Sequence, residues 1–202
     1  MITYNRQQLI DICQLVYDRY LTNAAGSNFS VRSSKDTLYI TPTNNAKNNR
    51  LRMGADDLLL VDYQGNILDG EGQLSRSWPT HLKMYQEFDC VNAVIHAHPK
   101  MATVFACRQT VMPPYLDAMK KYGSIPVLPR DLAVDSPEFG QAIAEVFRNT
   151  ASFTKNGHAV FYPYHGILVA APSLEDAYDL LERIEFNATA ILFSRLMESD
   201  GA

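Results

Sequence analysis

Two histidines stand two residues apart at the end of an apolar run, in the stretch AVIHAHPK that begins at Ala93. Alternate side chains of a strand point to the same side, so His96 and His98 share one face, with Cβ atoms roughly 7 Å apart. Imidazoles at that spacing can converge on one ion through metal–nitrogen bonds of about 2.1 Å. The alternative is that one histidine is buried and hydrogen-bonded while the other reaches solvent. A third ligand elsewhere in the chain would favour the metal site.

A third histidine, His165, lies in YPYHGILVA, between aromatic residues and another apolar stretch. A histidine buried alone at the end of an apolar strand leaves a polar nitrogen to satisfy, which is unfavourable. One shared divalent cation would satisfy all three and leave an open coordination position for a substrate. His81 and His158 are open to three interpretations: further ligands, partners of ligands, or structural residues. The structural interpretation is favoured for His158.

The composition is that of one ordinary globular domain, predicted to span residues 1–202, with 47% hydrophobic and 20% charged residues. A net charge of −4 gives no electrostatic reason to expect nucleic acid or a membrane as a partner. The sequence contains no apolar run of about 18 residues, the length that would predict a membrane span. The N-terminal residues lack the pattern of a secretory signal peptide. The scattered Cys13, Cys90 and Cys107, in apolar surroundings, predict buried free thiols and a cytoplasmic protein.

Hydrophobic periodicity predicts an α/β chain, with helical layers around a central mixed or antiparallel sheet. We expect strands within residues 24–32, 36–43, 57–68, 91–98 and 157–171. We expect helices over residues 5–21, 99–107, 114–122 and 137–148, one after Ser77 as N-cap, and a long one from Ser173, with Asp176 completing a capping pair. The polar, basic and asparagine-rich residues 44–54 are expected to form a mobile loop.

The order of five motifs resembles that of the class II aldolase/adducin family, and of its sugar-phosphate aldolases in particular. The motifs are AAGSNFSVR, LYITPT, LLLVDYQGNILDGEGQLSRSWPTHLKMYQ, NAVIHAH, and YHGILVA followed by LEDAYDLLERIE, within about residues 7 to 193. The resemblance implies a three-layer α/β/α fold with a nine-stranded, mostly antiparallel central sheet. It also implies a homotetramer with active sites between subunits. It further implies a divalent ion, Zn²⁺ or another cation such as Mn²⁺, held by residues that match His96, His98 and His165.

In such aldolases the metal acts as a Lewis acid on a small hydroxy-carbonyl or sugar-phosphate substrate, and stabilises the enediolate left when a carbon–carbon bond breaks. A glutamate in a PSSEW-like segment normally shuttles the proton, but LSRSW places Ser77 there. A serine is a poor base at neutral pH, so altered acid–base chemistry is expected. Tyr115, in MPPYLDAM, matches a tyrosine that reaches in from the neighbouring subunit as an acid; alternatively it is a core tyrosine on a helix. Glu71 and Asp117 are spare carboxylates for the missing role, although both are more simply explained as solvated.

The resemblance places Asn28, Thr43, Ser75 and Arg76 around an anionic end of the substrate. Arg76 replaces a small residue of the family pattern, and either grips a phosphate or carboxylate bidentately or is a surface arginine in a turn. Two family glycines, which let backbone N–H groups close on a phosphate, are replaced here in Ser27-Asn28 and at Asn44. These replacements predict a rebuilt anion pocket or a substrate without phosphate.

Two classes of function follow from these residues. The first is a metal-dependent carbon–carbon lyase, either an aldolase, an epimerase that uses retro-aldol chemistry, or a decarboxylase. A decarboxylase needs a metal and a cation more than a strong base, because carbon dioxide leaves without a deprotonation. The second class is a non-catalytic, adducin-like scaffold, against which the three histidines argue. We expect a cytoplasmic homotetramer acting on a small molecule, with neither nucleic acid nor membrane as a partner.

Overall fold

The computed structural model describes residues 2–134 and 136–199, so the predicted domain of residues 1–202 includes five residues that lie outside the described part. Seven strands form one sheet in the order β4-β3-β2-β1-β5-β7-β6, and every neighbouring pair is antiparallel. The strands are β1 (Asn28–Arg32), β2 (Thr37–Ile40), β3 (Leu59–Asp62), β4 (Ile67–Asp69), β5 (Ala93–Ala97), β6 (His158–Tyr162) and β7 (Gly166–Ala171). The predicted α/β fold with an antiparallel sheet is confirmed, whereas the described residues form seven strands and not nine.

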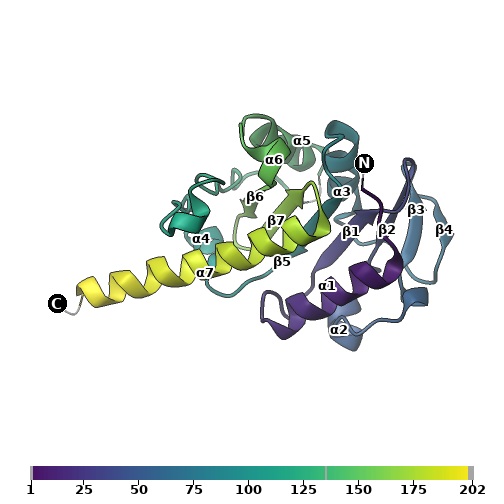
Figure 1. Ribbon diagram of the computed structural model, residues 1–202, viewed down its shortest axis with the longest axis horizontal. Helices are drawn as coiled ribbons and strands as arrows, with labels where there is room; N and C mark the ends of the chain where they lie inside the picture. The colour runs from purple at the N-terminus through teal and green to yellow at the C-terminus, as the bar shows by residue number, and fades with distance from the viewer. Residues whose placement is uncertain (1, 135, 200–202) are drawn as a thin grey trace.

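Helices cover both faces of the sheet (Figure 1). They are α1 (Arg6–Asp18), α2 (Asn45–Asn49), α3 (Trp78–Glu87), α4 (Ala102–Arg108), α5 (Pro137–Arg148), α6 (Phe153–Asn156) and α7 (Leu174–Ser199), with 3₁₀ turns at Ala55–Asp57 and Asp117–Met119. One core packs α1, α4 and α7 against the sheet, and a second packs α3, α5 and α6 against the opposite face. The chain therefore has the three layers implied by the family resemblance.

Strand β5 shows how one short sequence serves both cores. Ala93, Ile95 and Ala97 belong to the core beneath α1, α4 and α7, and Val94 belongs to the core beneath α3 and α5. All five residues of β5 are buried, as expected for a central strand covered on both sides. By the same alternation His96 lies on the α3 side of the sheet.

Two predictions of local structure are wrong. Residues 44–54 are not an unstructured loop, because they contain α2, and Leu51 is fully buried in the core. Residues 114–122 form only the 3₁₀ turn and no α-helix. Two bonds to α7 hold the preceding backbone: the Leu116 N–H donates to Asn187 Oδ1, and Asn187 Nδ2 donates to the Pro113 carbonyl, both at 2.9 Å. The amide of one buried asparagine thus replaces the hydrogen bonds of a helical turn.

The cysteines differ from the prediction in their exposure. All three are free, as expected, but only Cys13 is buried; Cys90 is half-buried and Cys107 is exposed. Cys107 lies near the end of α4, whose buried face carries Ala102, Phe105 and Ala106. Within residues 2–134 and 136–199, no helix is both long and apolar enough to cross a bilayer.

The start of α7 is capped as predicted. The Asp176 N–H donates to Ser173 Oγ at 3.0 Å, and the Ser173 hydroxyl donates to the Asp176 carboxylate at 2.6 Å. This reciprocal pair satisfies one N–H group that the first helical turn leaves without an intrahelical partner.

Replacing Ser173 with alanine should lower the free energy of unfolding by about 1 kcal/mol, because the Asp176 N–H loses its acceptor. Ser152→Ala is a matched control, since Ser152 stands before α6 without a side-chain capping bond. Urea unfolding of both variants measures the difference. Equal destabilisation of the two would contradict a capping role for Ser173.

Candidate metal centre

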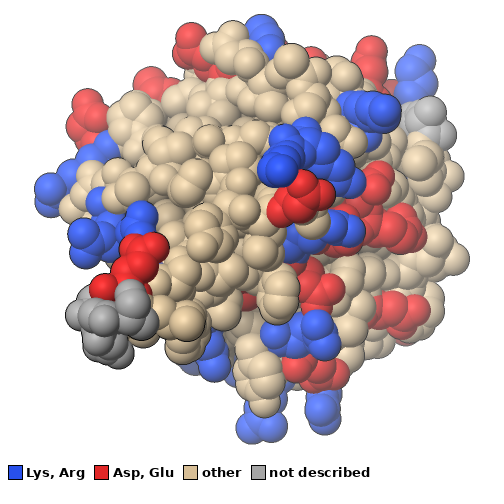
Figure 2. All heavy atoms as spheres, turned by 60° about the vertical axis from the view of Figure 1, so that its left-hand side comes forward, with Lys and Arg blue, Asp and Glu red and all other residues tan. Residues whose placement is uncertain are grey.

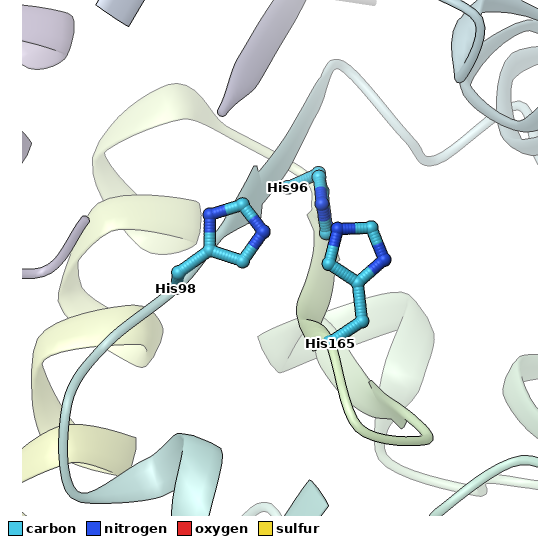
Figure 3. Close-up of side chains that lie close together, drawn as sticks. All are labelled: His96, His98 and His165. Atoms are coloured by element: carbon cyan, nitrogen blue, oxygen red, sulfur yellow. The ribbon is translucent and has the colours of Figure 1, made fainter. Parts of the chain in front are cut away.

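Three histidines from two segments of the chain converge at one end of the sheet. His96 lies in β5, His98 directly follows that strand, and His165 lies in the turn between β6 and β7. Because β5 and β7 are paired, the turn before β7 is held beside the end of β5. Figure 3 shows the three rings gathered around a common space, with His96 and His98 on one segment and His165 on another.

The geometry of the cluster suits a shared cation. One ring nitrogen from each histidine lies within 4.8 Å of the other two, and the ring centroids are 4.8 to 5.0 Å apart. Nitrogens that share one tetrahedral zinc ion lie about 3.4 Å apart, so binding needs the rings to approach by about an ångström. The imidazole donor set also suits zinc, copper, iron or nickel.

The protonation of His96 leaves one of its nitrogens available to a metal. Its Nδ1 lies 3.0 Å from the Ile167 carbonyl, which only accepts, so Nδ1 carries the proton and Nε2 has a free lone pair. Burial, followed by the neighbouring His98 and His165, holds the pKa of His96 well below its usual value. Burial, followed by His165, lowers the pKa of His98 to about 4, although the Gly26 carbonyl opposes this shift. Both rings are therefore neutral at pH 7, as metal ligands must be.

Neighbouring groups fix the positions of the rings. The Tyr162 ring stacks on His96, with centroids 4.9 Å apart and planes 18° apart. Gly166 lies against His98: a Cβ there would be 2.6 Å from His98 Cδ2 and 2.4 Å from the Ala97 carbonyl oxygen. The expectation that all three histidines are buried is wrong for His165, which is exposed because it lies in the turn.

A cavity of about 180 Å³ opens beside the three histidines. Five of the six residues that the sequence assigned to substrate binding or proton transfer line it: Asn28, Thr43, Ser75, Arg76 and Ser77, but not Tyr115. The remaining lining residues are Ala24, Ala25, Gly26, Ser27, Asn44 and Lys47. Ser77 precedes α3 as expected, but its side chain makes no capping bond; instead its N–H donates to Ser75 Oγ at 3.2 Å.

Lys47 is a pocket residue that the sequence did not single out. It lies on α2, and the only signal was the basic character of residues 44–54. Asn44, just before α2, adopts a left-handed conformation with φ of 61°. This is the conformation that a glycine takes most readily, and asparagine tolerates it better than most residues. An asparagine at this position therefore supports the left-handed turn before α2.

The charge of the pocket is one-sided. Arg76 and Lys47 line it, and none of the described residues that line it is Asp or Glu. Glu71 lines a separate hollow with Asp56, Asp57 and Asp69, and Asp117 is exposed and paired with Lys120. Neither spare carboxylate lies at the site. Tyr115 does not line the pocket of its own chain and has an exposed side chain, so its role stays a prediction.

The other two histidines are structural or supporting residues. His81 is fully buried and lies 2.7 Å from both Ser30 Oγ and Asn28 Oδ1, which makes it the partner of a pocket residue. His158 is buried against the Phe147 ring, with centroids 5.7 Å apart, away from the pocket. The structural interpretation of His158 thus agrees with its surroundings.

Comparisons with known proteins find similar sequences and a similar fold. The family described as the Class II Aldolase and Adducin N-terminal domain matches residues 7–192. The chain is 30% identical over 176 residues to an L-fuculose phosphate aldolase of Methanococcus maripaludis (strain C7), covering 87% of this chain and 89% of that protein. It is 28% identical over 199 residues to a 3-oxo-tetronate 4-phosphate decarboxylase of Haemophilus influenzae, covering 95% and 87%. A solved L-fuculose 1-phosphate aldolase superposes with a TM-score of 0.81 at 27% identity, covering 95% of this chain and 86% of that one.

The free energy of unfolding should fall as the pH is lowered from 7.5 to 5. Burial lowers the pKa of His81 to about 3 and that of His158 to about 4, whereas a histidine in the unfolded chain titrates near 6.5. Below pH 6.5 the unfolded state binds more protons than the folded state. The free energy of unfolding therefore falls as the pH drops from 6.5 toward the folded pKa, by about 2 kcal/mol per histidine at pH 5. Urea unfolding of the wild type and His158→Leu measures this. The free energy of unfolding of the variant should fall by about 2 kcal/mol less than that of the wild type between pH 7.5 and 5. Equal decreases would contradict a lowered pKa of His158 in the folded protein.

Proposed function

The chain belongs to the class II aldolase and adducin family, and we propose that it is a metal-dependent carbon–carbon lyase acting on a small anionic hydroxy-carbonyl compound. The observation that carries this proposal is the convergence of three histidines beside a pocket with two cations and no carboxylate among its described lining residues. We further propose that residues 1–202 form one domain and that the enzyme is cytoplasmic.

His96, His98 and His165 would hold the divalent cation, Zn²⁺ or another ion such as Mn²⁺. When bound, the ion supplies a Lewis acid next to the pocket, which stabilises negative charge that develops on a carbonyl oxygen. His96 keeps its Nδ1 proton on the Ile167 carbonyl and offers Nε2. His165 lies on the open side of the cluster, and its turn faces the cavity. His96 and His98 fit this role because their neutral rings bind without first losing a proton.

The opposite part of the pocket would hold the anionic end of the substrate. Arg76 offers a planar set of donors that matches the oxygens of a phosphate or carboxylate, and Lys47 adds a second positive charge. Asn28, Thr43 and Ser75 add polar donors around the same space. A substrate held at both ends would place its reacting bond between the cation and the anion pocket.

Decarboxylation is a specific second candidate within the lyase class. Ser77 lines the pocket at the position of the family glutamate, and no Asp or Glu among the described residues lines it. Retro-aldol cleavage needs a group that takes a proton from a hydroxyl, whereas loss of carbon dioxide does not. A relative named for decarboxylation of a phosphorylated oxo-acid, 28% identical to this chain, supports this variant. Under the non-catalytic alternative, a scaffold would have no use for three converging imidazoles.

Metal content and activity together test the proposal. The wild type should retain one divalent ion per chain, and His96→Ala and His165→Ala should weaken Zn²⁺ binding by more than the roughly 10–100-fold typical of losing a group that only supports a ligand. In a screen of ketose phosphates and phosphorylated oxo-acids with the metal-loaded protein, at least one compound should be cleaved. Ser77→Glu should raise retro-aldol cleavage and leave decarboxylation unchanged or lower. Folded variants that retain wild-type metal content, or a wild type that binds no metal, would contradict the proposed site.

We also propose a homotetramer in which Tyr115 reaches the pocket of a neighbouring subunit as an acid. The C-terminal half of α7 extends beyond the rest of the molecule in Figure 1, and its outer face carries exposed apolar side chains. Phe186, Phe193 and Met197 are spaced seven and four residues apart, so they lie on one side of the helix. The face shown in Figure 2 has a broad area without charged side chains, with charges grouped toward its right side and rim. Such areas are typical of protein–protein contacts.

Phe193→Asp should dissociate the oligomer, because a carboxylate would be buried without a partner in the contact. Leu68→Asp is the matched control, since the Leu68 side chain is equally exposed, at 54%. Leu68 lies on β4, the edge strand of the sheet, whereas Phe193 lies on α7. Size-exclusion chromatography with light scattering gives the mass of each species. The prediction is wrong if Phe193→Asp keeps the wild-type mass, or if the wild type is a monomer.

A further inference from the structure

A line of side-chain contacts within hydrogen-bonding distance runs from the α3 core to the pocket. It joins the side chains of Tyr85, Ser30, His81, Asn28 and Ser75. The contacts are 2.9 Å from Tyr85 to Ser30, 2.7 Å from Ser30 Oγ to His81 Nδ1, 2.7 Å from His81 Nε2 to Asn28 Oδ1, and 3.2 Å from Asn28 Nδ2 to Ser75 Oγ. Ser30 and His81 are fully buried, so the line reaches the cavity only through Asn28 and Ser75.

The direction of each bond follows from the amide of Asn28. Its Oδ1 faces His81 and only accepts, so His81 carries its proton on Nε2. His81 Nδ1 is then an acceptor, and the Ser30 hydroxyl donates a hydrogen bond to it. The Tyr85 hydroxyl donates to the Ser30 carbonyl at 2.7 Å, so neither hydroxyl has a proton left for the 2.9 Å contact between Tyr85 and Ser30 Oγ, and the directed hydrogen bonds begin at Ser30. Burial lowers the pKa of His81 to about 3, so the ring stays neutral and keeps a single N–H at physiological pH.

The same direction determines what the pocket presents. With its oxygen held by His81, Asn28 turns its N–H donors toward Ser75 and the cavity. Ser75 Oγ accepts from both Asn28 Nδ2 and the Ser77 N–H, each at 3.2 Å, so its own proton is directed elsewhere. Asn28 and Ser75 therefore act as donors in a pocket that Arg76 and Lys47 also line.

We propose that His81 is a positioning residue that fixes the Asn28 amide with its donors toward the pocket, so that this end of the pocket selects an oxyanion. His81 does not touch the substrate itself. It acts from the buried side of Asn28. If that amide were reversed, Asn28 would present its carbonyl oxygen to the anion and repel it. The inference rests on the proposed function only for the statement that this pocket holds the substrate.

Inorganic phosphate is the probe, and the test compares two amides in place of His81. A glutamine side chain can place its N–H where His81 Nε2 lies, so His81→Gln keeps the donor to Asn28. An asparagine reaches only the Nδ1 position, so His81→Asn bonds to Ser30 and leaves Asn28 free to turn. Titration calorimetry should show phosphate binding to His81→Gln within about threefold of the wild type, and about tenfold weaker binding to His81→Asn, as for loss of one hydrogen bond to a charged group. His158→Asn, at a buried histidine away from the pocket, should bind as the wild type does.

Two further measurements separate this inference from the proposed metal-dependent function and from effects of the substitutions on folding. Zn²⁺ binding should be the same in all four proteins, because His81 is not a ligand; a wild type that binds phosphate but no Zn²⁺ would overturn the proposed function and leave this inference standing. Long-range ¹H–¹⁵N NMR of the wild type should show the His81 proton on Nε2, which needs no variant to fold. A proton on Nδ1, phosphate binding to folded His81→Asn at wild-type strength, or no phosphate binding by the wild type would each overturn the inference.

Discussion

The antiparallel pairing of β5 with β1 and β7 is the constraint on which the site depends. It aligns Asn28 with His96 across one ladder and His96 with Leu168 across the other. A strand slipped by one residue would turn His96 into the opposite core and separate it from the turn that carries His165. Backbone hydrogen bonds of the sheet therefore bring together the three histidines and Asn28, which lie far apart in the sequence.

The sequence alone was enough to predict the features that depend on the spacing of residues along the chain. The HxH pair, the buried character of β5 and the capped start of α7 all reflect local periodicity, and the structure has each of them. It failed where a distant residue decides the local conformation, as at residues 114–122, where Asn187 takes over the backbone hydrogen bonds. It also missed Lys47, because nothing in residues 44–54 shows that buried Leu51 anchors this segment beside the pocket.

The positive charge of the pocket is not balanced by any carboxylate among its described lining residues. Arg76 and Lys47 both line it, and position 77 is a serine. A carboxylate at position 77 would neutralise part of their charge and compete with an anionic ligand. Serine at this position would therefore favour anion binding and weaken proton abstraction at the same time.

Gly166 has a consequence that reaches beyond the fit of one ring. As the first residue of β7, it belongs to the sheet, yet its missing side chain leaves room for His98 and for the Ala97 carbonyl. A side chain at this position would displace either the Ala97 carbonyl or the His98 ring. The pairing of β5 with β7 and the placement of His98 therefore both depend on the same missing Cβ.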